Sequence, residues 1–308
     1  MIDRVVRKIR EAGHLRTARA VLATPPIVPT DDRVVIFSMI GTRVLLPYLV
    51  AVKSLHAALG LGRIAILDDG TLSDSDKAVL AEHCGDPLIR SIADISTGHC
   101  PRGGCWERLL TLLDMTADDY VVQLDSDTVT IGAVPEVAAA IAANRSFTML
   151  GDPTADANGL LSLPDFMAVY HPGGSGIDPT GSAHVQASIE GHWDRYPDAA
   201  AHRYVRGSAG FTGFARGGVA SPASAAAFSR AAADIVGAEK WTRWGSEQVA
   251  SNFLVANSID PVLLPYARYI NYWNEPPAAG AAFLHFVGTH RYSTGEYRRR
   301  TRAAIAAL

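Results

Sequence analysis

Residues 120–129 read Tyr-Val-Val-Gln-Leu-Asp-Ser-Asp-Thr-Val, and this stretch decides the fold. Its first five residues form a short apolar run, which is typical of a buried strand in an α/β sheet. The run ends in two carboxylates, Asp125 and Asp127, and ligands of such sheets collect beyond the carboxyl ends of the strands. Two hard oxygen ligands there suit Mg²⁺ or Mn²⁺, which in turn suit a diphosphate. A plain turn at a strand end is the alternative, because Asp and Ser favour turns.

The segments around this stretch alternate between strand and helix patterns. We expect buried strands at residues 34–38, 63–67 and 147–150, and helices at 45–59, 73–84, 104–115 and 135–143. This alternation over residues 33–152 predicts a parallel, doubly wound arrangement. Residues 153–207 are rich in Gly, Pro, His and Asp and predict loops and short elements over a site. Further on we expect a strand at 210–215, helices at 221–236 and 247–257, and strands near 261–264 and 282–286.

Composition sets the class of protein. The chain has 308 residues, 48% hydrophobic and 19% charged, which is enough for one large α/β domain or two small ones and excludes wholesale disorder. The formal net charge of −3 argues against nucleic acid as the main partner. The sequence has no run of 18 apolar residues, so we expect no spanning helix. Residues 1–19 are basic without an apolar core, unlike a secretory signal, so we predict a cytoplasmic location.

The cysteines bear on the redox state and on zinc. Their odd number, Cys84, Cys100 and Cys105, fits reduced thiols. With His83 and His99 they could be scattered zinc ligands. However, the gap between Cys100 and Cys105 is looser than in zinc knuckles, and no second paired cluster follows. This pattern therefore favours free thiols.

Asp125-Ser126-Asp127 after a strand matches the Asp-X-Asp motif of glycosyltransferases that use nucleotide sugars. Residues 284–292, Leu-His-Phe-Val-Gly-Thr-His-Arg-Tyr, resemble the His-(Phe/Tyr)-X-Gly-X-X-Lys-Pro-Trp end of glycosyltransferase family 8, a family with the A-type fold. The resemblance implies that His285 is the third metal ligand and that Gly288 and Arg291 meet the diphosphate. Arg can replace Lys there and adds bidentate geometry. Tyr-Ser after Arg291 departs from Pro-Trp, and His290 is the rival metal ligand.

Three weaker matches lie in the same order as in family 8. Asp152 ends the next strand, where the family places an acidic residue facing the sugar. Residues 208–211, Ser-Ala-Gly-Phe, resemble its Asn-Ala-Gly-Val strand, with Ser208 in place of Asn. Residues 247–252 resemble its Asp-Gln-X-X-X-Asn helix start, so the resemblance implies that Glu247 binds sugar hydroxyls and Gln248 lies on the reacting face. It also implies retention of the anomeric configuration, although Asp152 or Glu247 could serve equally as a base for inversion.

The nucleotide end is less marked. In this fold the first strand and the turn after the second hold the ribose and base, which makes Ser38 and Asp68, or its neighbour Asp69, candidate contacts. Turn and helix-capping roles are the alternative for the two aspartates. Arg108 falls where related enzymes carry a basic residue, and we expect a diphosphate or base contact, or else a surface cation paired with Glu107 or Asp114. The complete set of predicted nucleotide-binding residues is Ser38, Asp68, Arg108, Ser126, Gly288 and Arg291.

Aromatic and imidazole groups mark the irregular segment. They could contact an acceptor glycan, or they could form a small core of the loops. The residues concerned are His184, His192, Trp193, Tyr196 and His202, and Trp241, Trp244 and Trp273 are equally ambiguous.

These patterns predict a Rossmann-like A-type glycosyltransferase fold with a mixed, mostly parallel sheet flanked by helices. Residues 1–29 would be an N-terminal amphipathic helix and linker, 30–295 the catalytic domain, with 153–207 as an acceptor-side insertion, and 296–308 a basic C-terminal helix. The predicted function is transfer of a sugar from a nucleoside diphosphate donor, a UDP-sugar by resemblance, to a glycan, lipid-linked or protein acceptor. Mn²⁺ or Mg²⁺ would be held by Asp125, Asp127 and His285. The two basic ends could touch anionic lipid from the cytoplasmic side, although solvated helix faces are the simpler interpretation.

Two other functions fit parts of the pattern. Residues 125–129 also fit the Asp-X-Asp-X-(Thr/Val) motif of haloacid dehalogenase phosphohydrolases, with Asp125 as the nucleophile. The echo of its second acidic motif, at Gly151 to Asp156, follows after only about 25 residues, too few for the intervening motifs. A non-catalytic module that binds a sugar nucleotide or glycan is the second rival, and Ser208 in place of Asn favours it.

Overall fold

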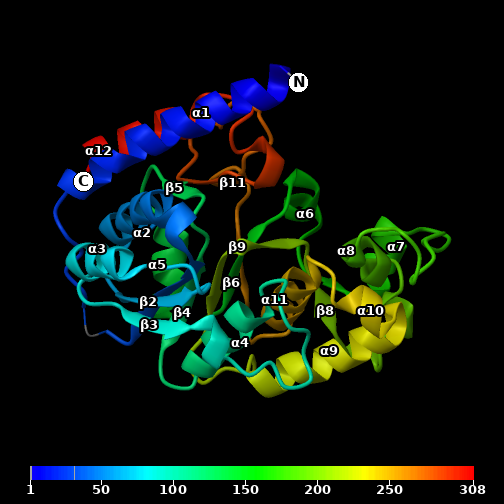
Figure 1. Cartoon of the computed structure of the whole chain (residues 1–308). Coiled ribbons are helices and arrows are strands. Elements are labelled where there is room, and N and C mark those ends of the chain that lie inside the picture. The colour runs from blue at the N-terminus through cyan, green and yellow to red at the C-terminus, as the bar shows by residue number, and fades with distance from the viewer. Residues whose placement is uncertain (1, 31) are drawn as a thin grey trace. The chain divides into compact units, whose positions relative to one another are not determined.

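The structure, a computed structural model, describes residues 2–30 and 32–308 (Figure 1). Met1 and Asp31, which belong to the predicted N-terminal segment and catalytic domain, lie outside the described residues. The chain forms two compact units. Unit 1 contains the residues up to Asp94 together with 122–142 and 264–308, and unit 2 contains residues 95–121 and 143–263.

Unit 1 is built on three parallel strands. β1 (Val34–Ile40) pairs with β2 (Arg63–Asp68), which pairs with β3 (Leu88–Ser91). The helices α2 (Leu45–Leu59) and α3 (Asp74–Cys84) connect them. β1 is an almost continuous apolar run because both faces of a parallel sheet are covered. Ser73 and Asp76 form a capping box at the start of α3, which satisfies backbone N–H groups that the first turn leaves free.

The three strands belong to a seven-stranded sheet with the order β10-β6-β9-β4-β1-β2-β3. β4 (Tyr120–Leu124) is the buried apolar run that the sequence predicts. The mixed, mostly parallel α/β sheet confirms the predicted fold class.

Unit 1 has a second sheet of three short strands. Their hydrogen-bonded pairing identifies them as strands, because they are too short to show a sequence pattern. β12 (Phe283–His285) pairs antiparallel with β5 (Thr128–Thr130) and parallel with β11 (Tyr269–Asn271). α5 (Pro135–Ala142) follows β5. β5 and β11 were not predicted, because three residues are too few to show a strand period.

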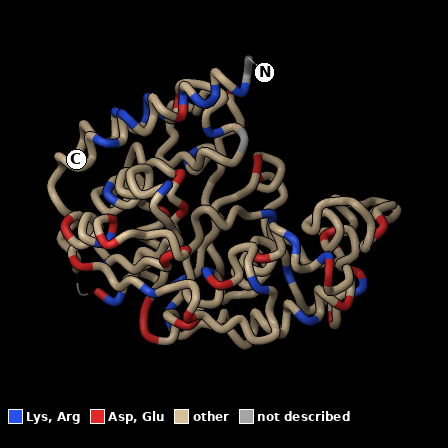
Figure 2. The backbone as a smooth tube through the Cα atoms, viewed as in Figure 1, with Lys and Arg blue, Asp and Glu red and all other residues tan. Residues whose placement is uncertain are grey.

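The two ends of the chain form helices that pack on each other in unit 1 (Figure 1). They are α1 (Ile2–Ala18), which a 3₁₀ turn at Arg19–Ala23 follows, and α12 (Glu296–Ala306). His14 of α1 is 1% exposed, its ring stacks 3.8 Å from that of Tyr297, and its Nε2 lies 3.0 Å from the Thr301 hydroxyl. Lys and Arg residues recur along α1 (Figure 2). Among the helices of residues 2–30 and 32–308, none has the length and apolar character to span a membrane.

Unit 2 contains the antiparallel part of the central sheet. β6 (Phe147–Leu150) pairs antiparallel with β9 (Gly207–Phe214). The strand–helix alternation did not predict the antiparallel direction of this pair. The other elements of unit 2 are α4 (Trp106–Met115), α6 (Pro153–Asn158), β7 (Leu161–Ser162), α7 (Leu163–Tyr170), α8 (Val185–Glu190), β8 (Arg203–Tyr204), α9 (Pro222–Val236), α10 (Ala238–Trp241), α11 (Ser246–Ala256) and β10 (Val262–Leu264).

The irregular segment of unit 2 has an aromatic core. Trp193 is fully buried, and its ring lies 5.0–6.3 Å from those of Tyr204, Tyr196, Phe228 and Phe253. The geometry therefore favours the core interpretation for Trp193. Trp241 is buried as well, whereas Trp244 is 72% exposed and Trp273, in unit 1, is 47% exposed.

The buried His14 predicts a pH-dependent stability. Burial, with the charges of Arg291 and Arg298, lowers the pKa of His14 from 6.5 to about 3. Below pH 6.5 the unfolded chain binds a proton at this residue and the folded chain does not, so folding stability falls as the pH falls from 6.5 towards 3. From pH 7 to pH 5 this residue should cost about 2 kcal/mol of folding free energy. Urea unfolding of wild type and His14→Gln at both pH values measures the difference. His99→Gln, at an exposed histidine, is the control. An equal pH dependence in wild type and His14→Gln would contradict the prediction.

Candidate functional site

The predicted metal ligands gather at the end of β4. Ligand atoms of Asp125, Asp127 and His285 all lie within 4.8 Å of one another. The register of β12 against β5 explains why, since His285 pairs with Thr128, the residue after Asp127, and Phe286 N–H donates to the Asp127 carbonyl at 2.8 Å. A separation of about 160 residues in sequence is thereby closed by one antiparallel pairing.

Asn271 orients the imidazole of His285. The Asn271 side-chain oxygen lies 2.9 Å from Nδ1 of His285. An amide oxygen only accepts hydrogen bonds, so Nδ1 carries the proton and Nε2 faces the carboxylates. His285 Nε2 is 3.4 Å from Asp127 Oδ1 and 3.8 Å from Asp125 Oδ2. Metal-binding histidines usually have such a partner on the second nitrogen. Sequence reasoning missed Asn271, because only the pairing of β11 with β12 brings it beside His285.

Asp127 is the electrostatic centre of the cluster. It is 6% exposed, and its Oδ2 forms an ion pair with Arg291. Burial alone would raise the pKa of Asp127, but His285 and Arg291 outweigh it and lower this pKa to about 2. Burial would likewise lower the pKa of His285, whereas the charges of Asp127 and Asp125 raise it. Asp127 is therefore held as a carboxylate and never as a neutral acid at ordinary pH.

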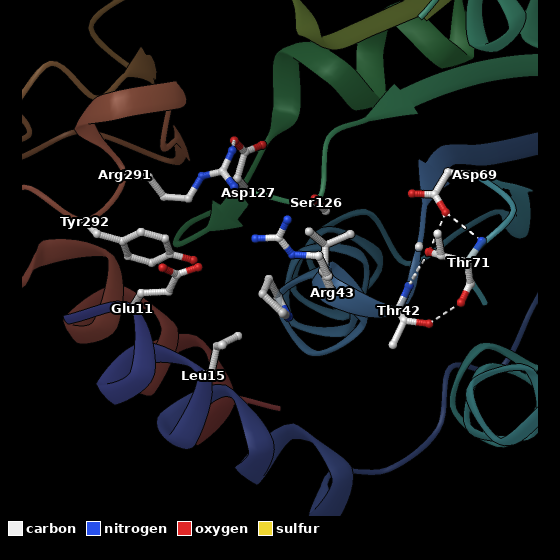
Figure 3. Close-up of a pocket in the computed structure, with 13 residues that line it drawn as sticks. Glu11, Leu15, Thr42, Arg43, Asp69, Thr71, Ser126, Asp127, Arg291 and Tyr292 are labelled. Carbon is white, nitrogen blue, oxygen red and sulfur yellow. Dashed lines mark hydrogen bonds and ion pairs between the residues drawn. The ribbon is translucent and has the colours of Figure 1, made fainter. Parts of the chain in front are cut away.

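A cavity of about 420 Å³ in unit 1 opens beside Asp127 (Figure 3). Ser126, Asp127 and Arg291 line it, as do residues that follow β1 and β2 and two residues of α1. The lining residues are Glu11, Leu15, Gly41, Thr42, Arg43, Val44, Pro47, Asp69, Thr71, Ser126, Asp127, Arg291 and Tyr292. The cavity thus lies at the carboxyl ends of parallel strands, where α/β sheets bind their ligands.

The turns after β1 and β2 are tied together at the cavity. Asp69 accepts hydrogen bonds from the Thr71 backbone N–H at 3.0 Å and from its hydroxyl at 2.6 Å, and Thr42 N–H donates to that hydroxyl at 3.2 Å. A Cβ at Gly41 would clash with the Asp69 carboxylate and the Thr71 hydroxyl, so a larger residue there would force these side chains to move. Sequence reasoning missed Thr42, Arg43 and Thr71.

Two predicted nucleotide contacts in unit 1 have side chains committed elsewhere. Ser38 is fully buried, and its hydroxyl donates to the Leu124 carbonyl at 2.7 Å. Asp68 is buried and accepts from the N–H groups of Gly70 and Leu72, with Lys77 at 3.3 Å. Burial would raise the pKa of Asp68, but these donors lower it. Neither residue lines the cavity, whereas Asp69 does.

The predicted diphosphate-binding segment contains a glycine with a positive φ. Gly288 has φ +39°, which favours glycine, and it begins the 3₁₀ turn Gly288–His290. Arg291 follows this turn and also donates from Nε to the Phe286 carbonyl at 3.2 Å. His290, the rival ligand, lies 2.7 Å from the Asn274 amide nitrogen and is not part of the acidic cluster.

The remaining predicted residues belong to unit 2. Asp152 caps α6, accepting from Ala155 N–H at 2.8 Å. Arg108 and Glu247 are both buried and form an ion pair at 3.1 Å, so Arg108 is not a surface cation. Gln248 donates from Nε2 to the Gln186 side-chain oxygen at 3.2 Å.

The buried pair predicts that Glu247 supports the fold whatever else it does. Breaking a buried ion pair by removing one partner costs about 3–5 kcal/mol, because the second charge stays buried. We therefore expect Glu247→Ala to lower the free energy of unfolding by that amount in urea titrations. Glu239→Ala, which breaks the exposed pair with Arg243, should cost less than about 1 kcal/mol. Equal stability of the two variants would contradict the prediction.

Comparison with known proteins finds similarity in structure alone. No family model and no curated protein matches the sequence. The apo structure of the bifunctional glycosyltransferase WbbM superposes with a TM-score of 0.52 at 11% identity, covering 90% of this chain. This chain spans only 51% of that one.

Two further structures superpose with lower scores. Galactosyltransferase LgtC, in complex with donor and acceptor sugar analogues, has a TM-score of 0.47 at 13% identity, covering 89% of this chain and 96% of that one. Mouse xyloside xylosyltransferase 1, in its apo form, has 0.45 at 11% identity, covering 84% and 98%. At these identities the likeness concerns the fold, and membership in glycosyltransferase family 8 stays a prediction. The chain has the A-type glycosyltransferase fold.

Proposed function

We propose that this chain is a metal-dependent glycosyltransferase that moves a sugar from a nucleoside diphosphate donor to an acceptor. The observation that carries the proposal is the cluster of Asp125, Asp127 and His285 at the edge of a cavity that also contains Arg43 and Arg291. Acidic ligands for a cation and guanidinium groups for phosphate are the two parts of a diphosphate site.

The donor set suits Mn²⁺ or Mg²⁺. Two carboxylates supply hard oxygen ligands, and an imidazole with its Nε2 turned towards them supplies a nitrogen. Asp125, Asp127 and His285 would hold the cation. When bound, it would act as a Lewis acid that offsets the negative charge growing on the diphosphate as the glycosidic bond breaks.

Arg291 and Arg43 would bind the diphosphate itself. Arg291 already compensates the buried Asp127, and its guanidinium has five donors, so it can serve the carboxylate and a phosphate oxygen together. Arg43 is exposed, and its guanidinium extends into the cavity beside Ser126 (Figure 3). No carboxylate forms an ion pair with Arg43 among the described side chains of residues 4–30, 32–288 and 290–308, so it can meet an anion without breaking an ion pair of the protein.

The nucleoside would contact the turns after β1 and β2, which are joined by hydrogen bonds. Asp69 and the hydroxyls of Thr42 and Thr71 offer acceptors and donors that suit ribose hydroxyls or a base edge. We propose Asp69 for the ribose or base contact that the family resemblance assigns to Asp68 or Asp69. A UDP-sugar remains the donor that the family resemblance suggests.

The sugar-facing roles rest on the resemblance. Asp152, Glu247 and Gln248 would bind or polarise the donor sugar, with retention of configuration. Arg108 would then act through Glu247, whose carboxylate it holds. The acceptor would be a glycan, a lipid-linked sugar or a protein. Any contact with anionic lipid would be made by the basic residues of the paired helices α1 and α12.

Release of nucleoside diphosphate from a panel of nucleotide sugars with Mn²⁺ tests the proposal. Wild type should release it, and chelation of the metal should stop the release. Asp127→Asn and His285→Ala should each lower the rate by about 10²-fold or more, because charge development at the leaving group loses its counter-charge. Asp118→Ala, which removes an exposed carboxylate, should keep the wild-type rate.

Folding of the variants is checked by near-ultraviolet circular dichroism. Full activity in a folded Asp127→Asn variant would overturn the metal-site assignment. Binding of a nucleotide sugar without any release of diphosphate would favour the non-catalytic alternative.

A further inference from the structure

Four polar side chains form a continuous chain of hydrogen bonds in unit 2. Arg206 Nε donates to Glu190 Oε2 at 2.9 Å, and a second guanidinium nitrogen lies 2.7 Å from the same oxygen. Gln186 Nε2 donates to Glu190 Oε1 at 2.8 Å. Gln248 Nε2 donates to Gln186 Oε1 at 3.2 Å. This series of hydrogen bonds thus leads from the Arg206 guanidinium through Glu190 and Gln186 to the side-chain amide of Gln248.

The chemistry of the carboxylate sets the direction of every bond. Arg206 can only donate, and an ionised Glu190 can only accept. Gln186 must therefore turn its NH₂ group to Glu190, which leaves its oxygen towards Gln248. Gln248 must in turn donate its NH₂ group, so its carbonyl oxygen is the atom that the chain leaves for other contacts. Among the described side chains of residues 4–30, 32–288 and 290–308, none donates a hydrogen bond to that oxygen.

The cationic end of this chain is firmly held. Glu190 is 1% exposed and sits one helical turn after Gln186 on α8, the spacing at which side chains meet. The Arg206 guanidinium lies 4.1 Å from the ring centroid of Tyr170 and 5.4 Å from that of Phe166. Burial would lower the pKa of Arg206, but the Glu190 carboxylate raises it. Arg206 therefore stays a cation that only donates, and its two contacts with Glu190 Oε2 set the direction of these hydrogen bonds.

We propose that Gln186, Glu190 and Arg206 are positioning residues that fix the side-chain amide of Gln248 with its carbonyl oxygen presented to the donor sugar. The inference rests on the proposed function, in which Gln248 faces the reacting side of that sugar. Glycosyl transfer builds positive charge at the anomeric carbon. A carbonyl oxygen stabilises that charge and an NH₂ group opposes it, so the orientation of one amide decides the sign of the interaction.

A single and a double variant separate positioning from general support of the fold. In Glu190→Gln the new amide can donate or accept, so Gln186 and Gln248 can both turn over. In the double variant Glu190→Gln, Gln186→Glu, the carboxylate moves one place along the chain. Gln at 190 then accepts from Arg206 and donates to the new carboxylate, which again accepts the NH₂ group of Gln248. The net charge is unchanged, and the original orientation of Gln248 is restored.

We expect Glu190→Gln to lower kcat by about 10- to 100-fold, the usual range for partners that orient a functional group. The KM for the donor and the affinity for Mn²⁺ with UDP should stay at the wild-type values. The double variant should recover most of kcat. In a Gln248→Ala background, Glu190→Gln should have no further effect. An undiminished kcat in Glu190→Gln, a failed rescue in a folded double variant, or an additive loss in the Gln248→Ala background would each overturn the proposal.

Nuclear magnetic resonance tests the chain without turnover. The ¹⁵N side-chain amide signals of Gln248, assigned with Gln248→Ala, should shift in Glu190→Gln and return in the double variant. Gln248 amide signals that do not shift in Glu190→Gln would overturn the proposed positioning of Gln248. Absence of diphosphate release from wild type would instead overturn the proposed function, and the amide signals keep the two failures apart.

Discussion

The buried carboxylate of Asp127 is the constraint on which the rest of unit 1 depends. A charge in the interior needs compensation, and here it comes from His285 on one oxygen and Arg291 on the other. Both partners arrive from the far end of the chain through the pairing of β12 with β5 and the glycine turn after it. The C-terminal segment is therefore part of the site and not an appendage to it.

The terminal helices α1 and α12 pack on each other next to this site. α12 begins at Glu296, shortly after Arg291 and Tyr292, and α1 contributes Glu11 and Leu15 to the cavity wall. His14 joins the two helices by stacking on Tyr297 and meeting Thr301. The basic N-terminal helix thus has a structural role, since it lines the cavity beyond the ends of β1 and β2 and packs on α12.

The sequence predicted the framework and the ionic cluster because each leaves a local pattern. Apolar runs predicted β1, β2, β4 and β6, and the spacing of His285, Gly288 and Arg291 matched a known motif. What it missed depends on tertiary pairing. Asn271 contacts His285 only because β11 pairs with β12. Arg43 and Thr71 have no distinctive sequence pattern, and only the folded turns after β1 and β2 place them at the same cavity. Asp68 and Asp69 are adjacent, and only the structure shows which of them is committed to backbone N–H groups.

The central claim is that Asp125, Asp127 and His285 together hold a divalent cation whose binding is tied to a diphosphate. Titration of Mn²⁺ into the full chain, followed by the electron paramagnetic resonance signal of free Mn²⁺, measures it most directly. The account predicts one bound Mn²⁺ per chain, bound more tightly when UDP is present and lost in His285→Ala. Equal Mn²⁺ binding by wild type and His285→Ala, or no Mn²⁺ binding with UDP present, would contradict it.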